Sequence, residues 1–211
     1  MRAALCDEAL RLGRMLVQFL PGEAEVHALV ALMELNASRT AARRGSNGEA
    51  VLLPDQDRSL WDDAQIQRGM SALEHAQRLG GGAGYYALQA AIAACHMRAC
   101  TAEDTDWERI VLLYDALMQT APSAIVALNR AVAVSMAQGP AAGLAALDAL
   151  DAPLAGYHLL HSVRGDLLMK LGNFPEARKE IQRAITLTKN LREQELLTEK
   201  LKQIEKAASS A

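Results

Sequence analysis

Apolar residues recur every three or four positions along most of the chain, which is the spacing of amphipathic α-helices. Glycine and proline interrupt this pattern at intervals, as at Pro21-Gly22 and Gly80-Gly81-Gly82, and both residue types end helices. Connections this short between neighbouring helices favour antiparallel hairpins. The pattern predicts helices over residues 3–20, 23–44, 60–79, 85–99, 105–121, 124–137, 140–150, 154–171, 175–188 and 192–208.

Composition agrees with this pattern. Of the 211 residues 51% are hydrophobic but only 4% are aromatic, so alanine, leucine, valine and methionine fill most apolar positions. Except for valine, these are good helix formers, and alternating runs of β-branched or aromatic residues are few. We therefore expect an all-α protein of about ten helices, in which antiparallel hairpins stack as a tetratricopeptide-like array.

The clearest repeat lies in the second half of the chain. Gly139 and Gly172 each separate two amphipathic segments and are 33 residues apart, close to the ~34-residue period of tetratricopeptide repeats. The best copy covers residues 161–189, where Gly165 occupies a position at which two helices pack closely. The last predicted helix carries charges of both signs around an apolar stripe, as a solvated capping helix does.

These observations suggest two halves. We expect an N-terminal helical half over residues 1–100, where no repeat is recognisable, and a tetratricopeptide-like half over residues 101–211. The two halves are expected to form one continuous structural unit. The helical pattern begins almost at the first residue without a capping group, which suggests that Met1-Arg2 is a cut made inside a longer protein.

The longest polar interruption of the helical pattern spans residues 45–61. Pro54 restricts the residue before it to an extended conformation, and Ser59 with Asp62 has the spacing of a capping box that opens the next helix. An alternative is a helix entry with surplus capping groups, whose aspartates favour the positive end of the helix dipole. The residues expected to form a protein contact or a structural latch are Asp55, Gln56, Asp57, Arg58 and Trp61.

A second polar feature, Asn129-Arg130, lies within an otherwise apolar predicted helix. An arginine among alanine and valine either extends to solvent or pairs with a carboxylate. We hypothesise that Asn129 or Arg130 holds the Asp55–Arg58 segment against the concave side of the array.

Patterns for catalysis or metal binding are weak. Cys95 and His96 point about 100° apart on a helix and Cys100 points about 140° from Cys95, so these three residues do not converge on a metal ion. The glycine-rich stretch after residue 79 lacks the lysine and the preceding strand of a phosphate-binding loop, and no serine stands in a nucleophile-elbow pattern. We expect no catalytic, cofactor-binding or metal-ligating residues, and a binding scaffold rather than an enzyme.

The charge of the chain and the absence of recognisable targeting signals further restrict the class of protein. The net charge is −3 and the pI about 6.0, so the chain has no overall basic field for nucleic acid. The local cluster of Arg39, Arg43 and Arg44 ends a predicted helix, where cations complement the dipole. No apolar run has the length of a membrane span and no signal peptide is recognisable. The three cysteines lack a disulfide framework, which is typical of a cytoplasmic protein.

Several strings carry a family resemblance. The most specific are Val51-Leu52-Leu53-Pro54-Asp55-Gln56-Asp57-Arg58 with Trp61, and Leu128-Asn129-Arg130-Ala131-Val132-Ala133-Val134. Together with Glu8-Ala9-Leu10-Arg11-Leu12-Gly13-Arg14 and Leu88-Gln89-Ala90-Ala91-Ile92-Ala93-Ala94, they make the chain similar, over nearly its whole length, to the C-terminal extension of bacterial extracytoplasmic-function sigma factors.

The resemblance implies a tetratricopeptide-like regulatory tail. In that family two helical modules, absent from this chain, bind core RNA polymerase and read promoter DNA. The resemblance also implies that the Asp-Gln-Asp-Arg motif and a late stretch containing Asp166 matter for sigma activity. The chain departs from the family at Gly165, Met169 and Asn173, where alanine and arginines are usual.

The expected function is therefore that of a non-catalytic regulatory domain. It would contact the sigma DNA-binding modules in cis, or core RNA polymerase, in the cytoplasm. Nucleic acid would be contacted only through the missing modules, and no membrane would be involved. The alternative is a free-standing tetratricopeptide-type scaffold that binds a partner protein or peptide.

Overall fold

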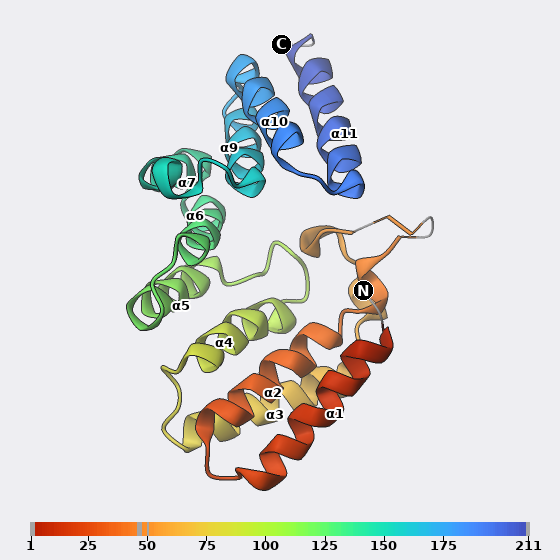
Figure 1. Cartoon of the computed structure of the whole chain (residues 1–211), viewed down its shortest axis with the longest axis vertical. Coiled ribbons are helices and arrows are strands. Elements are labelled where there is room, and N and C mark those ends of the chain that lie inside the picture. Colours follow the sequence, from red (N-terminus) through yellow and green to blue (C-terminus); the bar gives the residue numbers. More distant parts are fainter. Residues whose placement is uncertain (1–2, 46–47, 50, 210–211) are drawn as a thin grey trace. The chain divides into compact units, whose positions relative to one another are not determined.

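The computed structural model describes residues 3–45, 48–49 and 51–209, which form helices joined by loops and contain no β-strand. The all-α fold expected from the sequence, with hairpins of helices packed side by side, is confirmed. The chain divides into two compact units, Met1–Ala121 and Pro122–Ala211, whose helices are labelled in Figure 1.

The first unit is built around α2. It contains α1 (Ala3–Phe19), α2 (Ala24–Ala37), α3 (Asp63–Arg78), α4 (Tyr85–Arg98) and α5 (Trp107–Thr120), with the 3-10 turns η1 (Ala41–Arg43), η2 (Leu53–Asp55) and η3 (Arg58–Leu60). Helix α2 packs against α1, α3 and α4 (Figure 1). Helix α5 packs on α4, so this unit extends to Ala121 and not to the boundary expected at residue 100. Its central core contains Ala31, Leu35, Leu73, Ala90 and Ala94.

Two glutamates of α2 connect the helices of the first unit. Glu34 is buried and accepts hydrogen bonds from Arg14 of α1, at 2.5 and 2.8 Å, while Arg68 of α3 approaches it at 3.4 Å. Glu25 accepts from the backbone N–H groups of Tyr86 and Ala87, at 2.8 and 3.3 Å. Glu25 thereby satisfies donors at the N-terminus of α4, which no residue of α4 itself caps.

The second unit consists of hairpins. It contains α6 (Ala124–Gln138), α7 (Pro140–Leu147), η4 (Asp148–Leu150), α8 (Asp151–Leu154), α9 (His158–Lys170), α10 (Phe174–Leu187) and α11 (Leu191–Ala208). Helix α6 packs on α7, α9 on α10, and α10 on α11. One apolar cluster joins α6 to α9 and contains Leu128, Ala131, Leu147, Leu150, Leu154, Leu160 and Leu167. Another contains Ala177, Ile181, Ala184, Leu197 and Ile204.

Small residues allow the paired helices of the second unit to approach closely. A Cβ added at Gly165 of α9 would lie 2.7 Å from Ile181 Cδ1 of α10, and one added at Gly143 of α7 would lie 2.3 Å from Ser135 Cβ of α6. The turn after α9 has Gly172 at φ +77°, and Asn173 N–H donates to Leu168 O at 2.9 Å, as in a Schellman motif. The predicted close-packing glycine and inter-helix turn are therefore confirmed.

Helix α5 begins at a residue other than the one expected. The capping residue is Asp106, whose carboxylate accepts from Arg109 N–H at 2.9 Å, whereas Thr105 is buried and does not cap the helix.

Within the described part of the chain, no helix has both the length and the apolar character needed to cross a membrane.

Candidate functional site

Residues 51–61 fold as two consecutive 3-10 turns between α2 and α3. Pro54 lies in the first turn of η2, and Asp57 is the cap of η3, since its Oδ1 accepts from Ser59 N–H at 2.9 Å and from Ser59 Oγ at 2.7 Å. These hydrogen bonds hold the pKa of Asp57 below its ordinary value. The predicted Ser59–Asp62 capping box is therefore wrong: Ser59 is bonded to Asp57, and Asp62 alone caps α3 by accepting from Gln65 N–H at 2.9 Å.

Arg58 is the central side chain of this segment. Its Nη1 donates to His96 O at 2.8 Å and to Ala99 O at 2.9 Å, two carbonyl groups at the C-terminal end of α4. Helix ends leave such carbonyls without intrahelical partners and carry negative partial charge. The guanidinium carbon also lies 4.5 Å from the ring centroid of Trp61, a cation–π contact. Arg58 thus attaches the segment to α4.

Two further side chains of the segment point into the protein. Trp61 is only 8% exposed and Gln56 is buried. Gln56 Nε2 donates to Val51 O at 3.1 Å, which closes the segment on itself. The backbone N–H of Asp62 donates to Ser38 O at 2.9 Å, so the end of the segment is attached to the residue that follows α2.

The opposite side of the segment faces solvent. Asp55 and Asp57 are exposed, and so are the two leucines Leu52 and Leu60. The five predicted residues therefore divide into an inward group, Gln56, Arg58 and Trp61, and an outward group of two aspartates. Only the inward group acts as a latch. We call Leu52, Asp55, Asp57 and Leu60 the outer edge of the segment.

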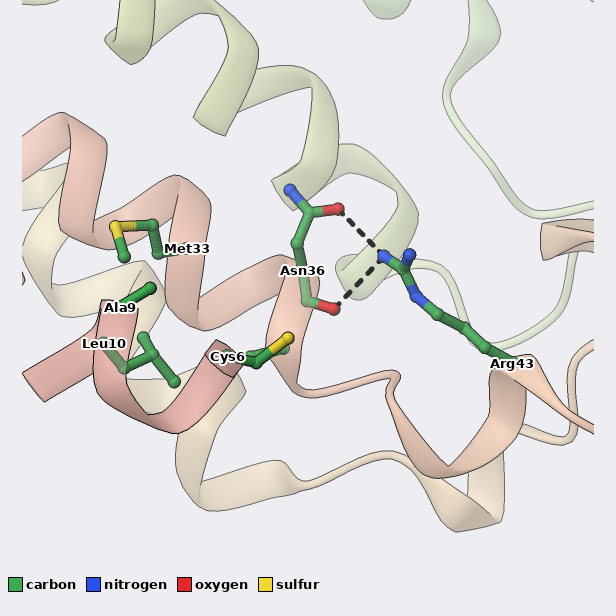
Figure 2. Close-up of a pocket in the computed structure, with 7 residues that line it drawn as sticks. Cys6, Ala9, Leu10, Met33, Asn36 and Arg43 are labelled. Atoms are coloured by element: carbon green, nitrogen blue, oxygen red, sulfur yellow. Dashed lines mark hydrogen bonds between the residues drawn. The ribbon is translucent and has the colours of Figure 1, made fainter. Parts of the chain in front are cut away.

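A cluster of arginines surrounds the latch. Arg39 Nη2 donates to Asn36 Oδ1 at 2.9 Å, and Arg43 Nη2 lies 3.3 Å from both Asn36 O and Asn36 Oδ1 (Figure 2). Burial, together with the nearby charges of Arg43 and Arg58, lowers the pKa of Arg39 to about 10. The three arginines expected to end this helix lie beyond Ala37, where α2 ends, and its last turn has no basic residue; of Arg39 and Arg43, only Arg43 contacts a backbone carbonyl of α2, that of Asn36.

Burial and the same arginines keep His96 neutral. They lower its pKa to about 4, with burial as the largest cause, followed by the charges of Arg39 and Arg58. The ring lies against Trp107 of α5, with 5.2 Å between ring centroids. A protonated His96 would place a third buried positive charge beside Arg39 and Arg58, and both burial and this repulsion disfavour the charged form.

Sequence reasoning missed the partners of the segment. Asn36 near the end of α2, Arg39 in the turn after it and Arg43 in η1 are three and four residues apart, and this spacing could have indicated that they act together. His96 gave no such signal, because its backbone carbonyl is what Arg58 contacts. Cys95 is buried, which raises the pKa of its thiol, and Cys100 is exposed. Among the described residues no three His, Cys, Asp or Glu side chains gather in a way that could hold a metal ion.

The other predicted residues lie in the second unit. Asn129 is exposed and Arg130 half-buried on α6, and their contact with the Asp55–Arg58 segment stays a prediction. Asp166 of α9 accepts from Lys200 Nζ of α11 at 2.6 Å. Asp166 therefore ties the last helix to the array, which gives it a structural role.

Comparison with known proteins places this segment inside a recognised region. Residues 1–77, which include α1, α2 and the whole of residues 51–61, match a family of unknown function (DUF6596). The chain is 49% identical over 191 residues to an uncharacterized protein of Rhizobium meliloti (strain 1021). The match covers 90% of this chain but 45% of the relative, so the chain spans less than half the length of that protein.

Proposed function

We propose that this chain is a non-catalytic interaction domain that regulates a bacterial extracytoplasmic-function sigma factor in cis. The observation that carries the proposal is the division of residues 51–61 into a locked inner side and an exposed outer edge. Arg58, Trp61 and Gln56 fix the backbone. Two aspartates and two leucines are thereby presented to solvent on a preorganised surface, which lowers the entropy cost of binding.

The chemistry of the outer edge suits a basic partner. Carboxylates give orientation and specificity to a protein contact, and exposed leucines supply apolar area. Modules that bind promoter DNA carry positive charge, and the strings that resemble the sigma-factor extension include this segment. Because the match covers only 45% of the Rhizobium relative, the rest of that protein is long enough to contain such modules. A cytoplasmic location belongs to this proposal, since RNA polymerase is cytoplasmic in bacteria.

The helical scaffold supports binding more than catalysis. Hairpin arrays stack small units and present extended surfaces to other proteins. The lowered pKa values of Arg39 and His96 near the latch are explained by burial and by the charges of neighbouring arginines. Neither is placed on the outer edge.

The test is a binding assay with two candidate partners, purified core RNA polymerase and the DNA-binding modules of an extracytoplasmic-function sigma factor. The charge reversal Asp55→Arg changes the outer edge without touching the latch. Glu74→Arg is the matched control, because Glu74 is an exposed residue of α3 and the substitution makes the same charge change in the same unit. We expect wild type and Glu74→Arg to bind one of the two partners and Asp55→Arg to bind at least about fivefold more weakly.

Two results would contradict the proposal. If neither partner binds the wild-type chain, the sigma-factor assignment fails and the free-standing scaffold becomes the better description. If both variants bind as the wild type does, the outer edge is not the contact.

A further inference from the structure

Helix α1 has two apolar sides, of which only one is packed. Leu10 is buried, and Gly13 lies so close to α2 that an added Cβ would be 3.2 Å from Val30 and 3.3 Å from Met33. The second apolar side faces away from α2. Its exposed residues are Leu5, Leu12, Met15, Leu16 and Phe19, with Leu20 directly after the helix, and we call these six residues the outer face of α1.

This outer face has the spacing of a helix-binding surface. Leu5, Leu12 and Phe19 are seven residues apart, and Leu16 stands between the last two. A seven-residue repeat keeps apolar side chains facing a helix that lies alongside. The exposure is large, with Phe19 75% and Leu12 52% accessible. Single exposed leucines are ordinary, whereas several exposed apolar side chains on one side of a helix mark a contact surface, and here Glu8, which pairs with Arg11, is the charged residue between Leu5 and Leu12 on that side.

A cavity lies next to the outer face. It has a volume of about 290 Å³ and is lined by Cys6, Ala9 and Leu10 of α1, by Met33, Asn36 and Ala37 of α2, and by Arg43 (Figure 2). Ala9 lines the cavity and is itself exposed, and it lies four residues after Leu5 on the same side of α1. The outer face and the cavity therefore form one continuous surface.

The far end of this surface is cationic. Arg43 contacts Asn36 through Nη2, while its buried Nε has no hydrogen-bond partner among the described residues. Arg39 also has a buried Nε without a hydrogen-bond partner among the described residues, and its Nη2 donates to the same Asn36 side chain. A ligand for the whole surface would thus combine an apolar stripe with a carboxylate at one end. An anionic membrane does not fit, because Asp7 and Glu8 of α1 are also exposed.

We infer that the outer face of α1 and the adjoining cavity receive an amphipathic helix from a segment equivalent to the part of the Rhizobium relative that lies outside the matched region. An acidic side chain of that helix would pair with Arg43. The inference rests on the proposed function, in which the additional part contains the sigma modules. It assigns the contact in cis to α1 and leaves the outer edge of residues 51–61 for orientation or for polymerase.

The probe is the part of the Rhizobium relative outside the matched segment, co-expressed with this chain. Co-purification and the affinity of the separated partners are measured for wild type, Leu12→Asp and Arg43→Gln. Leu196→Asp is the control, since Leu196 is an exposed leucine on α11. We expect binding by wild type and control, a loss of about tenfold or more for Leu12→Asp, and about fivefold for Arg43→Gln.

A second measurement does not depend on variants. Cys6 lines the cavity and is half-buried, so its alkylation by iodoacetamide, followed by mass spectrometry, should slow when the probe binds. Exposed Cys100 is the internal reference. Protection of Cys6 without protection of Cys100 supports the inference.

The remaining outcomes overturn it in distinguishable ways. Equal binding by all variants, with Cys6 unprotected, removes α1 from the contact but leaves the proposed function intact. Absence of binding to the probe, with core polymerase still bound, removes this inference alone, and absence of both removes the proposed function as well. A dimer of this chain that Leu12→Asp dissociates would show that a second copy occupies the face.

Discussion

Arg58 should contribute more to the stability of the first unit than any exposed arginine. Arg58→Ala removes two charge-assisted hydrogen bonds to the C-terminal carbonyls of α4, at 2.8 and 2.9 Å, and the contact with Trp61. Each such bond contributes about 1.5–3 kcal/mol when buried, and the cation–π contact about 1 kcal/mol. Partial exposure and the relief of repulsion with Arg39 offset part of this loss. We expect a net destabilisation of about 2–3 kcal/mol.

The assay uses the positions of the tryptophans. Trp61 and Trp107 are the two tryptophans of the chain, and both belong to the first unit. Urea unfolding followed by tryptophan fluorescence therefore reports on that unit. Arg58→Lys keeps the charge but loses the planar fork, so it should fall between wild type and Arg58→Ala. Amide exchange in the last turn of α4 should accelerate in both variants.

Arg78→Ala is the control, because Arg78 is an exposed arginine in the last turn of α3. If Arg58→Ala and Arg78→Ala differ in unfolding free energy by less than about 0.5 kcal/mol, the two carbonyl contacts contribute nothing beyond a surface charge. An unchanged exchange rate at the end of α4 would refute the latch directly.

Three further predictions concern other buried groups. Because the pKa of His96 is lowered to about 4 in the folded protein, the unfolded chain binds a proton more readily than the folded one. The free energy of unfolding should therefore be highest above about pH 6.5 and fall by about 3 kcal/mol toward pH 4. His96→Gln should flatten this pH profile when unfolding in urea is followed by fluorescence. Gly143→Ala would place a Cβ 2.3 Å from Ser135 Cβ and should destabilise the second unit by about 2–3 kcal/mol, measured by amide exchange in α6 and α7. Gly156→Ala is the control, because a Cβ at Gly156 has no atom within 4 Å, and it should leave the exchange unchanged. Equal destabilisation by the two variants would exclude close packing as the cause. Glu34→Gln removes the carboxylate shared by two arginines and should cost about 2–4 kcal/mol; a change below 1 kcal/mol in urea unfolding would show that the pair is not stabilising.

The helices and their turns were predictable because the signals are local. Apolar spacing gives the helices, and Gly172 with its positive φ gives a turn that few other residues adopt. Helix starts were less predictable where several capping residues compete. Asp57 takes the hydroxyl and the N–H of Ser59, and this leaves Asp62 to begin α3 three residues later than the pattern predicts.

The contacts of the candidate site were not predictable, because they join distant positions. Arg58 reaches carbonyl groups 38 and 41 residues away, and Glu25 caps a helix that begins 60 residues later. A sequence indicates which side chains can donate or accept, but it does not indicate where a backbone carbonyl will be left unpaired. The apolar spacing of residues 3–20 likewise predicts a helix, but it does not indicate whether the apolar side of that helix faces solvent.

The latch geometry also determines which variants can test function. Removing residues 55–58 would delete Arg58 together with Asp55, so it would release the end of α4 and expose Trp61 while it removed the outer edge. Loss of transcription from that deletion would follow from either change. Substitutions confined to Asp55 or Leu60 leave the latch contacts in place, since neither side chain takes part in them. A change in partner binding from these substitutions can therefore be attributed to the outer edge, provided that the urea midpoint of the first unit stays at the wild-type value.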